Sequence, residues 1–307
     1  MRHLAVASLL LTSLPLCAAP RLDEMDRRVR ERIGRFPGKV YLFAKNLDTG
    51  VTYAIGGDER VRTASTIKVP IMVEAFAQAE AGKFRWQDTM TLTEESMVSG
   101  SGILREMSPG LRIPMRDLVR LMIVVSDNTA TNLVLDRITA DAVNARMDAL
   151  GLKQTRSLRK ILGDGKKLKP VASGHSREGR LEEFQRFGIG VSTPREMVQL
   201  LELLEQGKAV SPAASAEMIA ILKREQYADG IGRTMPDAEI ASKSGALDHL
   251  RADIGIVYAK SGKVAMAITC EDVPGPNYTP ENPGLHLIAD VSVMLVEGLA
   301  SANPAGN

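Results

Sequence analysis

The 307-residue chain has few of the residues that build disulfide frameworks and metal sites. It contains only 2 cysteines and 4 histidines. The histidines are scattered: His3, His175, His249 and His286. Zinc sites need cysteine or histidine ligands at close, regular spacings, so we expect no metal site. One cysteine, Cys17, lies in an N-terminal segment that we expect to be removed, which leaves Cys270 without an internal disulfide partner.

A large excess of charge of one sign is also lacking. Lys and Arg number 39 against 37 Asp and Glu, a formal net charge of +2. Nucleic-acid binding normally requires a concentrated basic face, so we expect no nucleic-acid partner. The glycine pairs at 188–190 and 100–102 do not have the strand, turn and helix that a nucleotide loop requires. We interpret both as turns and expect no cofactor.

The chain has no apolar run long enough to anchor it in a membrane. Its first 20 residues, MRHLAVASLLLTSLPLCAAP, have a short basic start, an apolar stretch and small residues at the end. This pattern is typical of a secretory signal peptide, which we place at residues 1–19. The best later apolar run, Leu118–Val125, is short and contains Arg120. We therefore expect an exported bacterial protein, periplasmic or secreted, with no stable membrane insertion after signal cleavage.

Runs rich in β-forming residues lie near both ends of the chain. Residues 39–47 and 51–55 are separated by Asp48-Thr49-Gly50, whose Asp and Gly favour a turn, so they predict a hairpin. Three more such runs come much later, at 239–243, 253–259 and 263–270. These distant segments predict one antiparallel sheet.

Helical patterns occur at both ends and through the middle. Residues 22–33 and 283–299 carry terminal helical patterns, and the middle includes four more, at 65–81, 117–125, 129–138 and 195–206. The sequence therefore predicts an α+β fold, in which an antiparallel sheet flanked by terminal helices carries an inserted all-helical lobe. We expect a single domain over residues 20–307. Its sheet lobe would span about 22–62 and 238–300 and its helical lobe about 63–237, with a cleft at the seam.

The segment Ser65-Thr66-Ile67-Lys68 opens an apolar stretch that we expect to form a buried helix. Residues three apart lie on one helical face, so the Ser65 hydroxyl and the Lys68 amine can meet. A buried lysine loses its proton easily and can then accept one from the hydroxyl. The same S-x-x-K spacing recurs at 157–160, so this motif alone leaves an accidental match open.

Two more motifs can carry chemistry. Ser126-Asp127-Asn128 follows an apolar run, where it either caps the next helix or brings polar side chains to a site. Lys243-Ser244-Gly245 ends a short strand and can present a cation and a hydroxyl to a substrate carboxylate. Lys260-Ser261-Gly262 has the same letters but is better interpreted as a hairpin turn.

The three motifs in this order, S-x-x-K, S-D-N and K-S/T-G, resemble those of the penicillin-recognising serine enzymes, and most closely the class A β-lactamases. The order selects Ser65 over Ser157 and Lys243 over Lys260. The resemblance covers nearly the whole chain after the signal peptide, including the runs at 126–132, 193–197 and 251–254. It implies a serine hydrolase that opens β-lactam rings through a covalent acyl-serine intermediate and needs no cofactor.

The resemblance also implies catalytic roles for individual residues. Ser65 would attack the lactam carbonyl, and Lys68 would help to activate it. Ser126 would pass a proton to the departing lactam nitrogen. The backbone N–H groups of Ser65 and Ala246 would hold the oxyanion.

Other residues would bind the substrate. Asn128 would hold the side-chain amide of the substrate, and Lys243 and Ser244, next to Gly245, would bind its carboxylate. Arg251 would join them, although a solvated charge at the end of a strand is an equally good interpretation of that arginine.

The chain departs from the class A pattern within residues 153–190. Class A enzymes carry E-x-x-L-N there, and its glutamate positions the water that hydrolyses the acyl-enzyme. The best match is Glu178, in a run that has Glu182 in place of the asparagine. Glu182 or Glu183 could serve instead, or Glu178 is a surface residue and deacylation is slow. Three functions stay open: a β-lactam hydrolase, a D,D-peptidase acting on peptidoglycan stem peptides, and a slowly deacylating penicillin-binding sensor.

Overall fold

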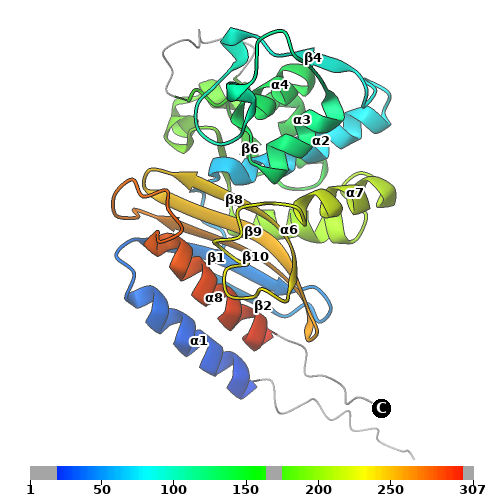
Figure 1. Ribbon diagram of the computed structural model, residues 1–307. Helices are drawn as coiled ribbons and strands as arrows, with labels where there is room; N and C mark the ends of the chain where they lie inside the picture. The colour runs from blue at the N-terminus through cyan, green and yellow to red at the C-terminus, as the bar shows by residue number, and fades with distance from the viewer. Residues whose placement is uncertain (1–18, 164–174, 300–307) are drawn as a thin grey trace, which may run out of the picture.

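A five-stranded antiparallel sheet forms the centre of one half of the molecule (Figure 1). The computed structural model describes residues 19–163 and 175–299, so the predicted signal peptide lies almost wholly outside the described residues. Across the sheet the strands are β2 (Thr52–Ile55), β1 (Lys39–Asn46), β10 (Gly262–Glu271), β9 (Leu250–Ala259) and β8 (Glu239–Leu247). Every neighbouring pair is antiparallel, as predicted.

Side chains of the sheet alternate between two apolar cores. Met266 and Ile268 of β10 belong to the core under the terminal helices α1 (Ala19–Gly34) and α8 (Pro283–Leu299). Ala265 and Ala267 belong to the core on the opposite face. Successive residues of a strand point to opposite faces, which explains how one strand serves both cores. The two terminal helices therefore flank the sheet, as the sequence predicts (Figure 1).

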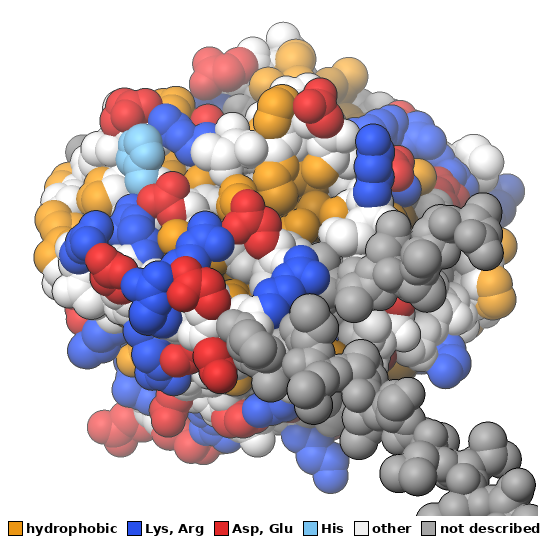
Figure 2. All heavy atoms as spheres, turned by 90° about the horizontal axis from the view of Figure 1, so that it is seen from below, with side chains coloured by type: hydrophobic (Ala, Val, Ile, Leu, Met, Phe, Trp, Pro, Cys, Tyr) orange, Lys and Arg blue, Asp and Glu red, His pale blue; other side chains and the backbone are white. Residues whose placement is uncertain are grey.

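Ion pairs join α1 and α8 on the outer surface. Arg28 Nη1 lies 2.9 Å from Glu297 Oε2, and Arg32 Nε lies 2.6 Å from Asp290 Oδ2. Exposed pairs of this kind each contribute at most about 1 kcal/mol, so the buried apolar face of α1 is the main attachment. Figure 2 views the molecule from below and shows basic and acidic side chains interspersed over the described surface.

The other half is built mainly of helices. They are α2 (Lys68–Glu80), α3 (Met115–Val124), α4 (Asn128–Ile138), α5 (Ala140–Ala149) and α7 (Pro212–Leu222). Residues 68–78 of α2 are all buried, in agreement with the apolar pattern of this segment. Three of the short 3-10 helices are η1 (Ala64–Ile67), η5 (Glu178–Arg180) and η6 (Glu182–Phe187). Two small sheets complete this half, β4 (Thr89–Thr91) with β5 (Arg112–Pro114), and β3 (Val61–Arg62), β7 (Gly190–Ser192) and β6 (Arg156–Ser157).

Helix α6 (Pro194–Glu205) covers the sheet face opposite the terminal helices and contacts β1 and β10. Its residues fall within the range expected for the helical lobe, and one continuous core joins them to the other helices. The proposed lobe boundaries therefore stay a prediction. None of the helices in the described part of the chain has the length and apolar character needed to cross a membrane.

Candidate active site

Ser65 lies in η1, directly before α2, and its side chain is half-buried. The preceding residue, Ala64, has a φ of 46°, which residues with a Cβ rarely adopt. Such strain persists where the surrounding structure enforces it, and it is frequent at functional sites. Gly245 of β8 permits the close approach: a Cβ there would lie 2.9 Å from the carbonyl oxygen of Thr63 and 3.2 Å from the Ser65 nitrogen.

Lys68 begins α2, and its side chain is fully buried. Its Nζ lies 2.6 Å from the carbonyl oxygen and 3.0 Å from the Oγ of Ser126, and 3.0 Å from Asn128 Oδ1. Burial, reinforced by the nearby charge of Lys243, holds the pKa of Lys68 well below its usual value. A neutral Lys68 can accept a proton, as a base for Ser65 requires.

The Ser126-Asp127-Asn128 segment both caps a helix and contributes to the site. The Asp127 carboxylate accepts a hydrogen bond of 2.8 Å from the backbone N–H of Ala130 and caps α4. Ser126 and Asn128 instead turn toward Lys68. Ser126 has a φ of 52°, a second strained backbone position at the site. Asp127 therefore caps the helix, while Ser126 and Asn128 bring polar side chains to the site.

Lys243 lies buried and forms an ion pair with Glu225. Glu225 Oε1 also accepts hydrogen bonds from the backbone N–H of Ser244, at 2.9 Å, and from Ser244 Oγ, at 2.8 Å. A buried ion pair is tolerated when further hydrogen bonds satisfy its remaining polar atoms, as here. Our sequence analysis missed Glu225, because a single glutamate in a polar connection carries no motif.

Asp253 adds a second buried carboxyl group beside this pair. It lies opposite Ser244 in the β8–β9 register, and its Oδ2 accepts a 2.9 Å hydrogen bond from the Ile231 N–H. Its Oδ1 has no hydrogen-bond partner within the described residues. Burial and the negative charge of Glu225 raise the pKa of Asp253 well above its usual value.

The backbone of β8 presents N–H groups to the crevice. β8 is an edge strand, and its Ser244 N–H points away from β9, toward Glu225. Because strand geometry repeats every two residues, the N–H of Ala246 points to the same side. Ala246 lines the crevice together with Ser65 and Gly245. This arrangement fits the oxyanion donors implied by the resemblance, Ser65 N–H and Ala246 N–H.

The crevice has a volume of ≈ 140 Å³. Its lining comprises Ser65, Ser101, Ser126, Tyr227, Asp229, Gly230, Ser244, Gly245, Ala246, Arg251, Tyr278 and Leu285. Our sequence analysis did not identify Tyr227, Asp229 and Tyr278, which come from connections without a motif. The structure thus places Ser65, Ser126 and Ser244 around one space, with Lys68 bound to Ser126 behind it.

Arg251 lines the crevice but uses its N–H groups elsewhere. Its Nη1 lies 2.5 Å from the carbonyl oxygen of Leu247 and 2.6 Å from that of Leu250, and its Nη2 binds the carbonyl of Asn277. The guanidinium carbon lies 4.8 Å from the ring centroid of Tyr278. Arg251 is thus a buried arginine that supports the crevice wall and adds positive charge to it.

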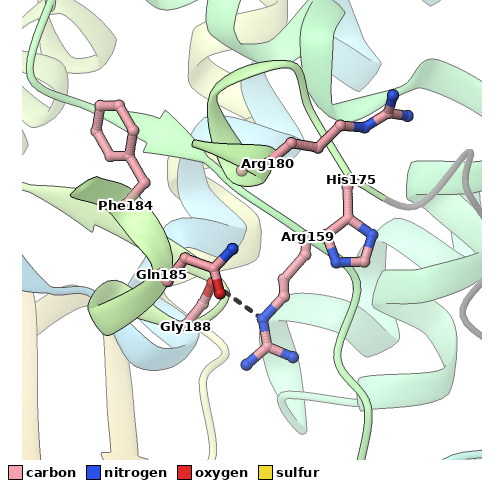
Figure 3. A pocket seen from close by; sticks show the side chains of 7 residues that line it. Arg159, His175, Arg180, Phe184, Gln185 and Gly188 are labelled. Carbon is pink, nitrogen blue, oxygen red and sulfur yellow. Dashed lines mark hydrogen bonds between the residues drawn. The ribbon is translucent and has the colours of Figure 1, made fainter. Parts of the chain in front are cut away.

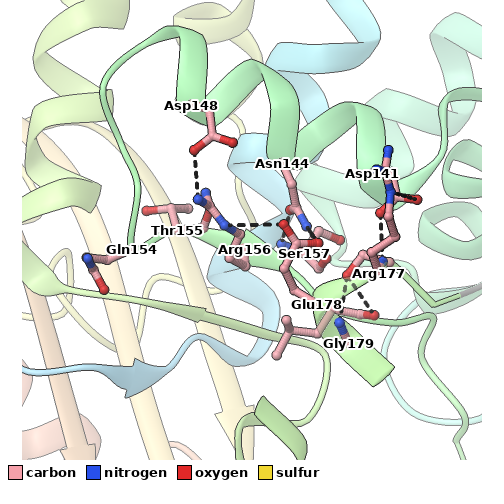
Figure 4. A network of polar contacts seen from close by, with 12 residues as sticks. Asp141, Asn144, Asp148, Gln154, Thr155, Arg156, Ser157, Arg177, Glu178 and Gly179 are labelled. Carbon is pink, nitrogen blue, oxygen red and sulfur yellow. Dashed lines mark hydrogen bonds and ion pairs between the residues drawn. The ribbon is translucent and has the colours of Figure 1, made fainter. Parts of the chain in front are cut away.

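Glu178 faces a different set of partners (Figure 4). Its Oε2 accepts a 3.1 Å hydrogen bond from Asn144 Nδ2 of α5, and its Oε1 lies 3.7 Å from Arg156 Nε of β6. Glu178 is not among the residues that line the Ser65 crevice, and neither are Glu182 and Glu183. Asp229 provides the one carboxylate in the described lining, and it belongs to the connection before β8.

A different residue of this loop is held beside the site. Asn128, Asn132 and Asp136 lie four residues apart along α4 and therefore form one stripe on its surface. Asn128 contacts Lys68, while Asn132 donates a 2.8 Å hydrogen bond to the carbonyl of Ile161 and accepts one of 2.9 Å from its N–H. Lys160 pairs with Asp136. The loop therefore presents Ile161, an apolar residue, one helical turn from Asn128.

The described part of the chain contains no group of three or more His, Cys, Asp and Glu side chains that could hold a metal ion. Cys270 is buried and unpaired.

Ser65 directly after the strained Ala64, the buried Lys68 of lowered pKa and the edge strand β8 form an arrangement that suits acyl transfer. The motifs that carry it, and the sheet with its terminal helices, are those of the class A β-lactamases. The chain belongs to the β-lactamase enzyme family, whose model matches residues 24–299.

Known proteins with similar sequences and folds include both β-lactamases and PBP-A. The chain is 23% identical over 249 residues to β-lactamase CARB-3 of Pseudomonas aeruginosa, covering 80% of this chain and 81% of CARB-3. It matches the crystal structure of a β-lactamase from Sphaerobacter thermophilus with a TM-score of 0.77 and 28% identity, over 90% of this chain and 97% of that one. A mutant of PBP-A, solved as an acyl-enzyme complex with penicillin G, matches with a TM-score of 0.73 and 26% identity, over 89% and 95%.

Proposed function

We propose that this protein is a serine enzyme that opens β-lactam rings, becomes acylated on Ser65 and releases the acyl group slowly. The observation that carries the proposal is that the residues predicted for acylation and the glutamate predicted for deacylation lie in different surroundings. Those for acylation surround one crevice, whereas Glu178 is bound to Asn144 and Arg156. Membership of the β-lactamase enzyme family and the likeness to PBP-A support the same chemistry.

In the acylation step, Ser65 Oγ forms a bond to the lactam carbonyl carbon and gives up its proton. Neutral Lys68 accepts that proton, directly or through Ser126, whose Oγ lies 3.0 Å from Lys68 Nζ. The N–H groups of Ser65 and Ala246 stabilise the oxyanion. Ser126 then donates a proton to the departing ring nitrogen as the carbon–nitrogen bond breaks. Arg251 adds positive charge to the crevice wall and Ser244 lines the same space, which suits a substrate carboxylate, whereas Lys243 is already paired with Glu225.

Slow release follows from the lining of the crevice. Hydrolysis of an acyl-serine needs a base that activates water within hydrogen-bond distance of the ester. The described residues of the loop provide no carboxylate there, and Ile161 occupies the loop position held against α4 beside Asn128. The chain thus keeps groups suited to acylation, while the loop residue bound to Asn132, one helical turn from Asn128, is the apolar Ile161.

The test is a reaction of the purified chain with a chromogenic cephalosporin, followed by absorbance and by intact mass. We expect a burst of about one equivalent of product, a slow steady phase and a mass increase that persists. Steady turnover without a persistent adduct would establish efficient hydrolysis instead. The absence of both product and adduct would contradict the proposal.

A D,D-peptidase acting on peptidoglycan stem peptides is the second candidate. None of the described loop residues that line the crevice is a carboxylate, which favours this function, because it does not require rapid hydrolysis of a β-lactam adduct. We also propose, from the N-terminal sequence, that the protein is exported. Export would bring it to the compartment that contains peptidoglycan stem peptides. Release of D-alanine from an N-acyl-D-Ala-D-Ala peptide, lost in Ser65→Ala, would support this function. A lack of D-alanine release at high enzyme concentration would exclude the D,D-peptidase function.

A further inference from the structure

A second cavity lies outside the Ser65 crevice, within the loop that departs from the class A pattern (Figure 3). Its volume is ≈ 500 Å³, within the range of small-molecule sites. Arg159, His175, Arg180, Phe184, Gln185 and Gly188 contribute to its wall. Nothing in the proposed reaction at Ser65 uses this space.

The wall of the cavity is held by backbone contacts. Arg159 and His175 face each other across an isolated antiparallel bridge, and the N–H of Ser176 donates a 3.0 Å hydrogen bond to the carbonyl of Leu158. Gly179 packs so closely on Leu158 that a Cβ would lie 1.9 Å from that carbonyl oxygen. The chain segments that carry Arg159, His175 and Arg180 are therefore fixed relative to one another.

Basic groups dominate the cavity. Arg159 is half-buried, and its Nε donates a 3.2 Å hydrogen bond to the carbonyl of Gly188. No described residue of the lining is acidic, and no described carboxylate forms an ion pair with Arg159. Glu178, which directly precedes Gly179 of the lining, is bound to Asn144 and Arg156 (Figure 4). Arg159 thus brings a positive charge to a cavity in which no described lining residue provides a negative one, beside a histidine that can also become charged.

We propose that this cavity binds a small organic anion through a phosphate or carboxylate group held by Arg159 and His175. The planar guanidinium of Arg159 suits both groups, because each accepts two parallel hydrogen bonds. The cavity is larger than an inorganic ion needs, and buried Phe184 provides an apolar wall for the rest of the molecule. This site is independent of the chemistry proposed at Ser65.

Binding of such an anion is coupled to the charge of His175. Burial, with the positive charges of Arg159 and Arg180, lowers the pKa of His175 in the empty cavity. These two arginines are the charged groups that face His175 within the described residues; Gln185 and Gly188 on the other side are neutral. An anion reverses that effect and raises the pKa of His175. Affinity therefore increases as the pH falls through the His175 transition.

The test is a titration of the purified chain with sodium phosphate, and separately with sodium acetate, at constant ionic strength set by NaCl. The ring protons of His175 are followed by NMR and assigned through loss of the signal in His175→Gln. We expect a saturable shift and a raised pKa of His175. In Arg159→Gln the affinity should fall by about tenfold or more, because a charge-assisted bidentate contact is lost.

Arg186→Gln is the matched control, because Arg186 lies on η6 of the same loop without lining this cavity. It should bind the anion as the unmodified chain does, and thermal melting should show that all variants are folded. Saturation by phosphate alone identifies a phosphate ligand, saturation by acetate alone a carboxylate, and saturation by both the shared chemistry. A His175 signal that responds to phosphate and acetate no more than to NaCl, or equally in Arg159→Gln, would overturn the proposal.

Discussion

The Ser65 crevice and the loop of residues 153–190 differ in how their charged groups are compensated. In the crevice, Lys243 is paired with Glu225, and burial lowers the pKa of Lys68. In the loop, the expected carboxylate is bound away from the crevice, and Arg159 has no described acidic partner. In the proposed mechanism, formation of the acyl-enzyme depends on the crevice and its hydrolysis on the loop. The first part keeps the family pattern and the second departs from it.

The largest expected effect is the loss of Ser65. Ser65→Ala removes the atom that forms the covalent bond, so no adduct should appear with any β-lactam. Intact mass after incubation with penicillin G measures this directly. Ser157→Ala, at the accidental S-x-x-K match, is the control and should leave adduct formation unchanged. An adduct on the Ser65→Ala chain would remove Ser65 from the mechanism.

Removing the base should slow acylation strongly. Lys68→Met keeps much of the apolar stem but cannot accept a proton, so we expect acylation to slow by about 10²- to 10⁴-fold. Stopped-flow measurement of the burst with a chromogenic cephalosporin gives the rate. The exposed Lys208 provides a control in Lys208→Met. An unchanged burst rate in Lys68→Met would show that another group accepts the proton.

A carboxylate at position 161 of the loop should speed the loss of the acyl group. Ile161→Glu places an acid on the backbone that Asn132 holds beside Asn128, where it can activate water. We expect loss of the acyl group to accelerate by about tenfold or more, with little change in acylation. Glu178→Gln is its counterpart and should leave deacylation unchanged. Slower deacylation in Glu178→Gln would restore Glu178 as the hydrolytic residue.

The close approach of β8 to η1 predicts a moderate effect on stability. In Gly245→Ala the new methyl group meets the backbone of Thr63 and Ser65, and overpacking of this kind costs about 1–3 kcal/mol. Urea unfolding should show the loss, and acylation should slow because Ser65 shifts. Gly34→Ala, where a Cβ meets no atom within 4 Å, serves as the control. Equal stability of the two variants would contradict the packing described.

The last prediction concerns pH. The folded pKa of Lys68 is lowered, so between that pKa and its ordinary value the unfolded chain binds more protons than the folded one. The contribution of Lys68 to stability therefore becomes less favourable as pH falls through this window. Lys68→Met removes the contribution, so its stability relative to the unmodified chain should rise from pH 9 to pH 6. Urea unfolding at both pH values checks the sign, and a constant difference would refute it.

The sequence predicted the sheet, both terminal helices and the motif residues of the crevice, because these depend on local periodicity and on short fixed spacings. Helix α8 spans Pro283–Leu299, as predicted, and Ser65, Ser126 and Ser244 meet around one space. Glu225 and Asp253 escaped prediction, since their role arises from burial beside Lys243 and from strand register. Neither leaves a periodic signal.

The sequence did not predict which residue of the loop at 153–190 lies beside α4. The E-x-x-L-N pattern selects Glu178, but a motif match within an irregular segment does not determine which side chain meets the crevice. The hydrogen bonds of Asn132 to Ile161 determine that placement, and they depend on contacts between segments remote in sequence. The sequence alone does not indicate that Asn132 of α4 binds the backbone of Ile161.

The lifetime of the acyl-enzyme tests the central claim most directly. The purified chain is mixed with penicillin G, separated from excess reagent, and followed by intact mass, with peptide mapping to locate the adduct. We predict that the adduct on Ser65 remains the main species long after acylation is complete. Return of the unmodified mass as fast as the adduct formed would contradict the account.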